Sequence, residues 1–186
     1  MGEHREQFVD LDATENTAEQ RAHEVREFLR SRGFAEPDEY AGDDRWPGAI
    51  VDRPGPAWQS AWNYQSGKPD PWDTITVVSP TKDTDQAFFL MDSTGPPSCR
   101  TCGEEFDEDA FWSSFKGWYE TRREPVLSCV ACGGRGLMGD QDTTGSAVVG
   151  RVAVVTSGAT PEVATEMLQA LRSGLGGRWA HVHMHL

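Results

Sequence analysis

A chain of 186 residues has room for one compact domain and a small additional module. Its 30 acidic residues outnumber its 17 lysines and arginines, and the resulting net charge of −13 repels nucleic-acid backbones. No apolar run approaches the ~18 residues of a membrane-spanning helix, and Met1–Glu6 contain no apolar segment of a secretory signal. These features argue against membrane insertion, disfavour nucleic acid as a partner and predict a cytoplasmic protein.

An amphipathic helix is expected near the start of the chain. The polar residues 1–16 predict a mobile tail. Thr17 and Gln20 have the spacing of a capping box, and Gly33 suits the left-handed position that ends a helix. Between them, apolar residues recur at helical spacing: Ala18, Ala22, Val25 and Leu29. The pattern predicts a helix over residues 18–32.

The next segment, residues 35–73, is rich in proline and glycine and contains four tryptophans: Trp46, Trp58, Trp62 and Trp72. Disordered segments are poor in aromatic residues, so we expect an ordered irregular layer that is held by indole rings. A short strand is expected at 49–51 and a short helix near 57–64. A ligand groove lined by tryptophan is the alternative.

Two β-rich runs, 72–79 and 86–92, flank a polar loop at 80–85. Their alternation and the turn-forming residues between them predict a β-hairpin.

All four cysteines stand in two short pairs, Cys99-Arg-Thr-Cys102-Gly and Cys129-Val-Ala-Cys132-Gly. Two intervening residues let a tight turn direct both sulfurs at one tetrahedral ion, and the following glycine permits the positive φ of such a turn. We expect one structural Zn²⁺ per chain, held by Cys99, Cys102, Cys129 and Cys132. Disulfides, a redox Cys-x-x-Cys pair and a rubredoxin-type iron centre remain alternatives.

Between the pairs, residues 107–122 predict a helix with one aromatic stripe: Phe111, Phe115, Trp118 and Tyr119. The stripe could pack the module onto the main domain, or it could form a partner surface. Arg100, Arg122, Arg123 and Arg135 could form a local basic patch, but neighbouring acidic residues would offset it.

The C-terminal third predicts a strand, a helix and a second strand. Val148–Thr156 is a β run that Gly150 interrupts, and Thr160-Pro161-Glu162 is a helix start with a capping residue, proline and an acid. Residues 179–186 alternate strictly, which completes a βαβ unit. No phosphate-binding glycine motif follows the first strand, so the sequence gives no support for nucleotide binding.

This last strand places His181, His183 and His185 on one face. Two imidazoles on one strand face can bind one metal ion, so a second, catalytic metal site is a candidate. The alternative is three half-exposed histidines on the surface of a sheet.

The paired Cys-x-x-Cys-Gly motifs resemble those of zinc ribbons, and the layout is similar to small uncharacterised actinobacterial zinc-ribbon proteins. The resemblance implies a metal site and no activity. We expect an α+β domain, formed by residues 17–95 and 137–186, with a zinc-ribbon module inserted at 96–136.

The expected function is a non-enzymatic adaptor or regulator that binds another protein. The acidic first half of the chain suits a basic partner. A nucleic-acid-associated accessory factor that uses the zinc ribbon, and a metalloenzyme that uses the histidine strand, are the alternatives.

Overall fold

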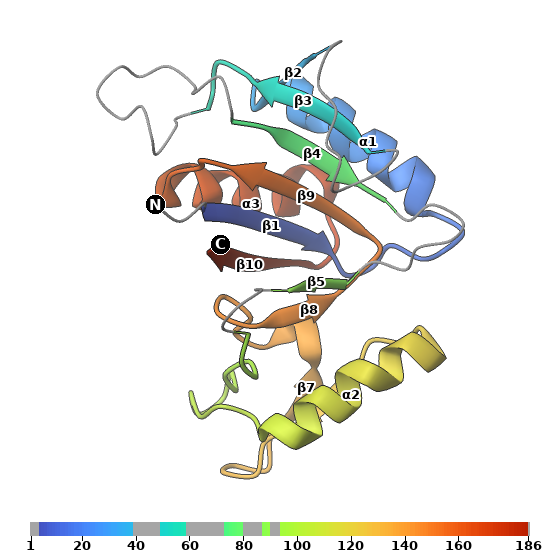
Figure 1. The fold of residues 1–186 in the computed structure, drawn as a ribbon, viewed down its shortest axis with the longest axis vertical. Coiled ribbons are helices and arrows are strands. Elements are labelled where there is room, and N and C mark those ends of the chain that lie inside the picture. Colours follow the sequence, from blue (N-terminus) through green and yellow to red (C-terminus); the bar gives the residue numbers. More distant parts are fainter. Residues whose placement is uncertain (1–3, 39–48, 59–72, 80–86, 90–93, 186) are drawn as a thin grey trace.

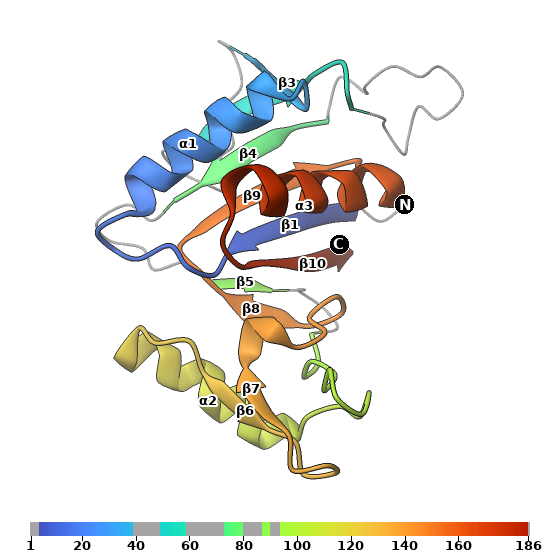
Figure 2. The same cartoon turned by 180° about the vertical axis from the view of Figure 1, so that it is seen from behind.

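A computed structural model describes residues 4–38, 49–58, 73–79, 87–89 and 94–185. Its centre is an antiparallel six-stranded sheet in the order β10-β1-β9-β4-β3-β2. The strands are β1 (His4–Asp10), β2 (Ala35–Pro37), β3 (Ile50–Pro54), β4 (Ile75–Val78), β9 (Val152–Ser157) and β10 (Trp179–His185). Helices α1 (Ala18–Ser31) and α3 (Pro161–Leu175) cover one face of the sheet (Figures 1 and 2). This arrangement confirms the α+β fold.

The start of the chain is a central strand, so the prediction of a mobile tail is wrong for residues 4–10. Strand β1 lies between β9 and β10 and pairs with both. Phe8 and Val9 are fully buried on opposite faces, and the polar residues Glu6 and Gln7 are at most 5% exposed. The polar composition hid this strand because buried polar side chains break the usual alternation of apolar and polar residues.

Helix α1 confirms the predicted helix and its C-terminal end. Gly33 has φ of +75°, and the backbone N–H groups of Gly33 and Phe34 donate to the carbonyls of Arg30 and Leu29 at 3.0 Å each. This pair of bonds is the Schellman arrangement. The predicted capping box is wrong, because the Thr17 hydroxyl accepts from the backbone N–H of Thr14 at 2.9 Å and makes no cap bond.

The predicted βαβ unit is formed by β9, α3 and β10. The Thr160 side chain caps α3 by accepting from the Val163 N–H at 3.3 Å. Strands β9 and β10 are parallel to each other, because both are antiparallel to β1. Strand β1 fills the position between them, so the unit is split by the N-terminal strand.

The predicted hairpin of residues 72–79 and 86–92 is wrong. Both strands exist in part, but β4 pairs with β3 and β9, whereas β5 (Ala87–Phe89) pairs with β8 (Ala147–Val149). All four residues of β4 are buried, so this strand fits the interior of the large sheet, where it has a neighbour on each side. The loop 80–86 lies outside the described residues.

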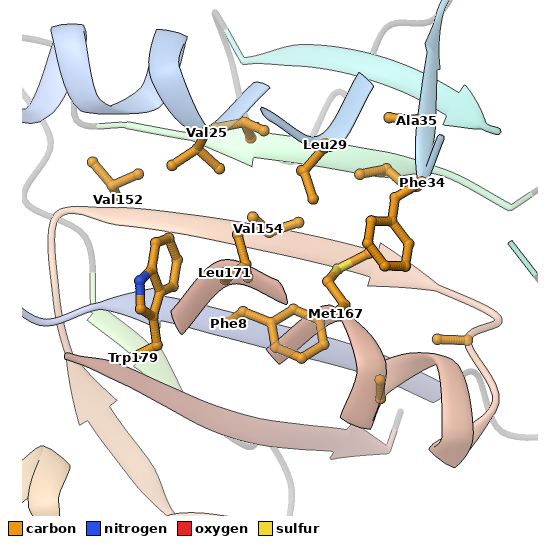
Figure 3. Packing of buried hydrophobic residues seen from close by; sticks show 14 of the residues in the cluster. Phe8, Val25, Leu29, Phe34, Ala35, Val152, Val154, Met167, Leu171 and Trp179 are labelled. Atoms are coloured by element: carbon orange, nitrogen blue, oxygen red, sulfur yellow. The ribbon is translucent and has the colours of Figure 1, made fainter. Parts of the chain in front are cut away.

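The main core lies between the sheet and its two helices (Figure 3). Phe8, Val154 and Trp179 from the sheet meet Leu29 of α1 and Met167 and Leu171 of α3. Trp58 is 2% exposed and belongs to this core, and its Nε1 donates to Asp73 at 3.3 Å. This tryptophan is therefore structural. The other three tryptophans of the segment, and most of the expected helix at 57–64, lie outside the described residues.

A second cluster forms the core of the cysteine-containing region, which comprises α2 (Glu108–Thr121), β6 (Val126–Ser128) and β7 (Arg135–Leu137). This region extends from one edge of the main sheet (Figure 1). The two-stranded β5–β8 ribbon joins them. Val148 of β8 packs against the main sheet, whereas Ala147 and Val149 pack into the second cluster. The alternating faces of β8 thus connect the cysteine-containing region to a third apolar cluster, on the sheet face opposite α1 and α3.

Candidate metal centre

The first cysteine pair lies in a tight turn that its own backbone closes. Ser98 and Glu105 form a β-bridge at its base. The Cys99 N–H donates to the Glu104 carbonyl, and the Gly103 N–H donates to the Cys99 carbonyl, both at 2.8 Å. Gly103 has φ of +79°, a value that glycine adopts without strain.

The second pair repeats this geometry at the tip of the β6–β7 hairpin. The Cys129 N–H donates to the Gly134 carbonyl at 2.8 Å, and the Gly133 N–H donates to the Cys129 carbonyl at 2.9 Å. Gly133 has φ of +72°. A Cβ on Gly134 would lie 3.1 Å from the Cys132 sulfur, so glycine also leaves room for the thiolate. The predicted need for glycine after each pair is confirmed.

The two turns bring the four sulfurs together. All four Sγ atoms lie within 4.8 Å of one another. The Cys99–Cys132 and Cys102–Cys129 distances are 3.8 and 3.6 Å, far beyond the ~2.05 Å of a disulfide. The cysteines are therefore four separate thiols that could hold a metal ion. Such spacing fits tetrahedral coordination at the ~2.3 Å that thiolates prefer.

The thiols of Cys99 and Cys102 have opposite tendencies to ionise. Backbone N–H groups of Cys102 and Thr101 lower the pKa of Cys99 to about 6. At Cys102, the backbone N–H of Glu104 also lowers the pKa, but the Cys132 thiol and burial raise it more, to about 12. Four thiolates this close repel one another unless a cation neutralises them. The turn geometry thus favours the thiolate form of Cys99, and a bound cation would stabilise the negative charge of the other three thiolates.

The centre lies at the rim of an aromatic cluster. Cys99 and Cys129 are buried in it, whereas Cys102 and Cys132 are exposed. Three residues of the predicted stripe on α2 pack there: Phe111, Phe115 and Trp118. The fourth residue of the stripe, Tyr119, is 44% exposed, and Trp112 on the same helix is 38% exposed. Asp107 caps α2 by accepting from the Ala110 N–H at 2.9 Å. Most of the stripe is therefore structural.

On the histidine strand β10, the rings of His181 and His183 share one carboxylate partner. Glu6 of β1 binds both rings, with His181 Nε2 at 2.6 Å and His183 Nδ1 at 2.8 Å. The His181 ring also stacks on Phe8, with 5.1 Å between centroids. Among the described residues, only the cysteines form a group that could hold a metal. The side chain of His185 is not among those that the structure describes, so the second metal site stays a prediction.

Arg178 joins the cysteine region to the sheet, and sequence patterns did not identify it. It lies between α3 and β10, and its guanidinium binds Glu124 at 2.8 Å and Asp140 at 2.7 Å. The bond to Glu124 raises the pKa of Arg178 above its usual range. The sequence patterns also did not identify Glu6 as the partner of the two histidines. Both depend on contacts between residues far apart in the chain, for which a single sequence carries no periodic signal.

Comparison with known proteins found no counterpart. No protein-family model, no curated protein and no solved structure matches the chain. No helix of the described residues is long and apolar enough to cross a bilayer.

Proposed function

We propose that the chain is a non-enzymatic, zinc-binding adaptor that docks on a basic partner protein through the outer face of α2. The four-cysteine site supports zinc, because a closed set of four thiolates with Cys-x-x-Cys spacing is the donor set of structural zinc sites. Zinc here has a structural role: it ties the two turns between which α2 is inserted.

The outer face of α2 is the observation that carries the adaptor proposal. Trp112, Phe115 and Tyr119 are consecutive partners in a ladder of edge-to-face ring contacts, at 5.8 and 6.2 Å between centroids. Phe115 is buried, while Trp112 and Tyr119 remain substantially exposed. Large aromatic rings that are held rigidly and half exposed are the residues that most often anchor protein interfaces.

Charge around this face suggests the nature of the partner. Between residues 104 and 120 the chain has six acidic residues and one lysine, a net charge of −5. A four-thiolate zinc site would add a further formal −2. An acidic surface with exposed aromatic rings attracts lysine and arginine side chains through Coulomb and cation–π interactions. The same charge weighs against nucleic acid. Of the four arginines of the expected basic patch, Arg122 lies over the Trp118 ring, with its guanidinium carbon 5.3 Å from the centroid.

Metal content tests the zinc half of the proposal. We expect one zinc per chain in protein purified without added metal, measured by elemental analysis. The Cys99→Ser and Cys132→Ser variants should lose the metal, whereas Val130→Ala, at an 83% exposed position between two of the cysteines, should keep it. One iron per chain, or full zinc in both serine variants, would contradict the proposed centre.

Affinity capture from the native host tests the adaptor half. The bait proteins are wild type, the double variant Trp112→Ala/Tyr119→Ala, and Val130→Ala as the matched exposed control. We expect a basic protein that wild type and Val130→Ala retain and that the double variant loses. The purified pair should then bind with an affinity that decreases as salt increases.

Equal capture by all three baits would show that the α2 face is not the docking surface. A captured partner that is acidic, or no partner specific to wild type, would equally refute the adaptor proposal. Circular dichroism of the double variant checks that its fold is intact.

A further inference from the structure

A polar pocket lies where the first cysteine turn meets the main domain. Its volume is about 520 Å³, within the ~300–1,000 Å³ of small-molecule sites. Three parts of the fold line it: the turn at 98–103, the segment 139–144, and the adjacent α3 and β10. The pocket therefore exists only when the cysteine region is docked on the sheet.

Two arginines from different parts of the fold line this pocket. Arg100 lies between the metal-binding candidates Cys99 and Cys102, and Arg172 comes from α3. No carboxylate among the described residues forms an ion pair with either guanidinium. In a chain with 30 acidic and 17 basic residues, two arginines in one pocket that pair with no carboxylate of the described residues are unexpected on charge grounds. They bring two cationic side chains to a pocket that also contains Asp142 and borders the cysteine site through Cys99.

The remaining polar groups fit an oxyanion. Ser98 and Thr144, two residues with hydroxyl groups, belong to the lining. Asp142, which is the one carboxylate among the described residues of the lining, accepts from the backbone N–H of Thr144 at 3.2 Å. The lining thus offers several donors, and its described carboxylate already has a backbone partner.

The backbone at Arg100 and the side chains of Arg172 and His181 are held before any ligand arrives. The Arg100 backbone N–H donates to Gln141 at 3.2 Å, and an Arg172 Nη donates to the Trp179 carbonyl at 2.7 Å. His181, also in the lining, is held by buried Glu6 and by stacking on Phe8. Groups that are already ordered lose little entropy on binding.

We propose that this pocket binds a small phosphate-bearing molecule. Two guanidiniums with neighbouring hydroxyl donors match the charge and the several acceptor oxygens of a phosphate group. Among the described residues of the lining, Leu168 and Ala180 are the two with purely aliphatic side chains, which is too little for a largely apolar ligand. The proposal does not depend on the α2 docking face, because none of the α2 residues lines the pocket.

The test is a titration of the purified, metal-loaded protein with inorganic phosphate and with pyrophosphate, followed by amide NMR shifts. We expect saturable shifts at Arg100 and Thr144. Arg100→Gln should weaken binding roughly tenfold or more, because one charge-assisted contact is lost. Arg135→Gln is the matched control: Arg135 is an exposed arginine of the second cysteine turn and lies outside the pocket lining.

Arg172 also donates to the backbone, so two variants separate charge from folding. Arg172→Lys, which keeps the charge, should bind within about threefold of wild type, and Arg172→Gln should bind roughly tenfold more weakly. No saturable binding by wild type would overturn the proposal. Equal loss in Arg135→Gln, or binding of a single-stranded oligonucleotide without saturable phosphate binding, would overturn it too.

Discussion

At the scale of single residues, one arginine links the cysteine region to the sheet. Arg178 is 32% exposed, while its partner Glu124 is only 13% exposed. The same Glu124 also accepts from the Gly139 N–H at 2.8 Å. A carboxylate with little access to water depends on these bonds, because removing them would leave a poorly solvated charge. The ion pair therefore fixes position more than it adds net stability.

Replacing Arg178 tests this role. Arg178→Gln should lower the free energy of unfolding by about 1–3 kcal/mol, since Glu124 loses a charged partner while it remains mostly buried. Urea denaturation measures the change. Arg53→Gln is the matched control, because Arg53 pairs with Glu36 where both side chains are exposed, at 61% and 45%. That control should change stability by no more than about 1 kcal/mol. Equal effects would mean that the contact with Glu124 has no special role.

At the scale of elements, the run Val148–Thr156 becomes two strands with different partners. Strand β8 pairs with β5 in the small ribbon, and β9 enters the large sheet. Gly150 lies between them, where a Cβ would stand 2.2 Å from Val9 Cγ1 and 3.2 Å from the Asp10 carbonyl oxygen. Only glycine lets the chain pass this close to β1 and change sheets. The interruption that the sequence predicted at Gly150 is therefore the point where the chain passes from the β5–β8 ribbon to the six-stranded sheet.

Gly150→Ala should destabilise the fold by about 1–3 kcal/mol, because the added methyl group overlaps the fully buried Val9. Gly145→Ala provides the control, as no atom lies within 4 Å of its Cβ position and its φ is not positive. It should stay within about 0.5 kcal/mol of wild type. Thermal and urea unfolding of both variants measure the difference. A Gly150→Ala protein as stable as Gly145→Ala would show that the passage between the two sheets accommodates a side chain.

At the scale of the whole molecule, the metal centre and the sheet are connected through two routes. Strand β8 packs with Val148 on the sheet face opposite the helices and with Ala147 and Val149 in the cysteine region, and Arg178 bridges the same two regions. The metal centre itself packs against the aromatic cluster of α2. Loss of the metal should therefore disturb α2 and its surroundings first, while the sheet and its two helices have a separate core that persists.

Acid should release the metal. Thiolates bind metal and thiols do not. The pKa of Cys99 is lowered to about 6, so its thiolate is present above that pH and is lost as the pH falls through it. We expect full metal content at pH 7.5 and release below about pH 6, since bound metal competes with protons.

Metal content across a pH series, together with near-ultraviolet circular dichroism of the α2 aromatic rings, measures the release. Far-ultraviolet circular dichroism should change less, because the sheet and its two helices do not contain the cysteines. Full metal retention well below pH 5, or loss of the whole fold together with the metal, would contradict this description.

Local patterns in the sequence determined the elements whose causes are local. The helix at 18–31 and its glycine end, the capped helix at 161–175 and the alternation of the last strand follow from residues within a few positions of one another. The cysteine site was predictable for the same reason, because each turn is encoded by five consecutive residues and the donor chemistry requires the two turns to meet.

Tertiary contacts decided the rest. Strand β1 is polar throughout its first four residues, without alternation, and becomes a strand because β9 and β10 provide partners on both sides. Strands β4 and β5 found partners distant in the chain instead of each other. The pairing of Glu6 with two histidines, the Arg178 ion pairs and the pocket between Arg100 and Arg172 join residues separated by 38 to 177 positions. Burial and pairing over such distances depend on the whole fold, so no short stretch of sequence encodes them.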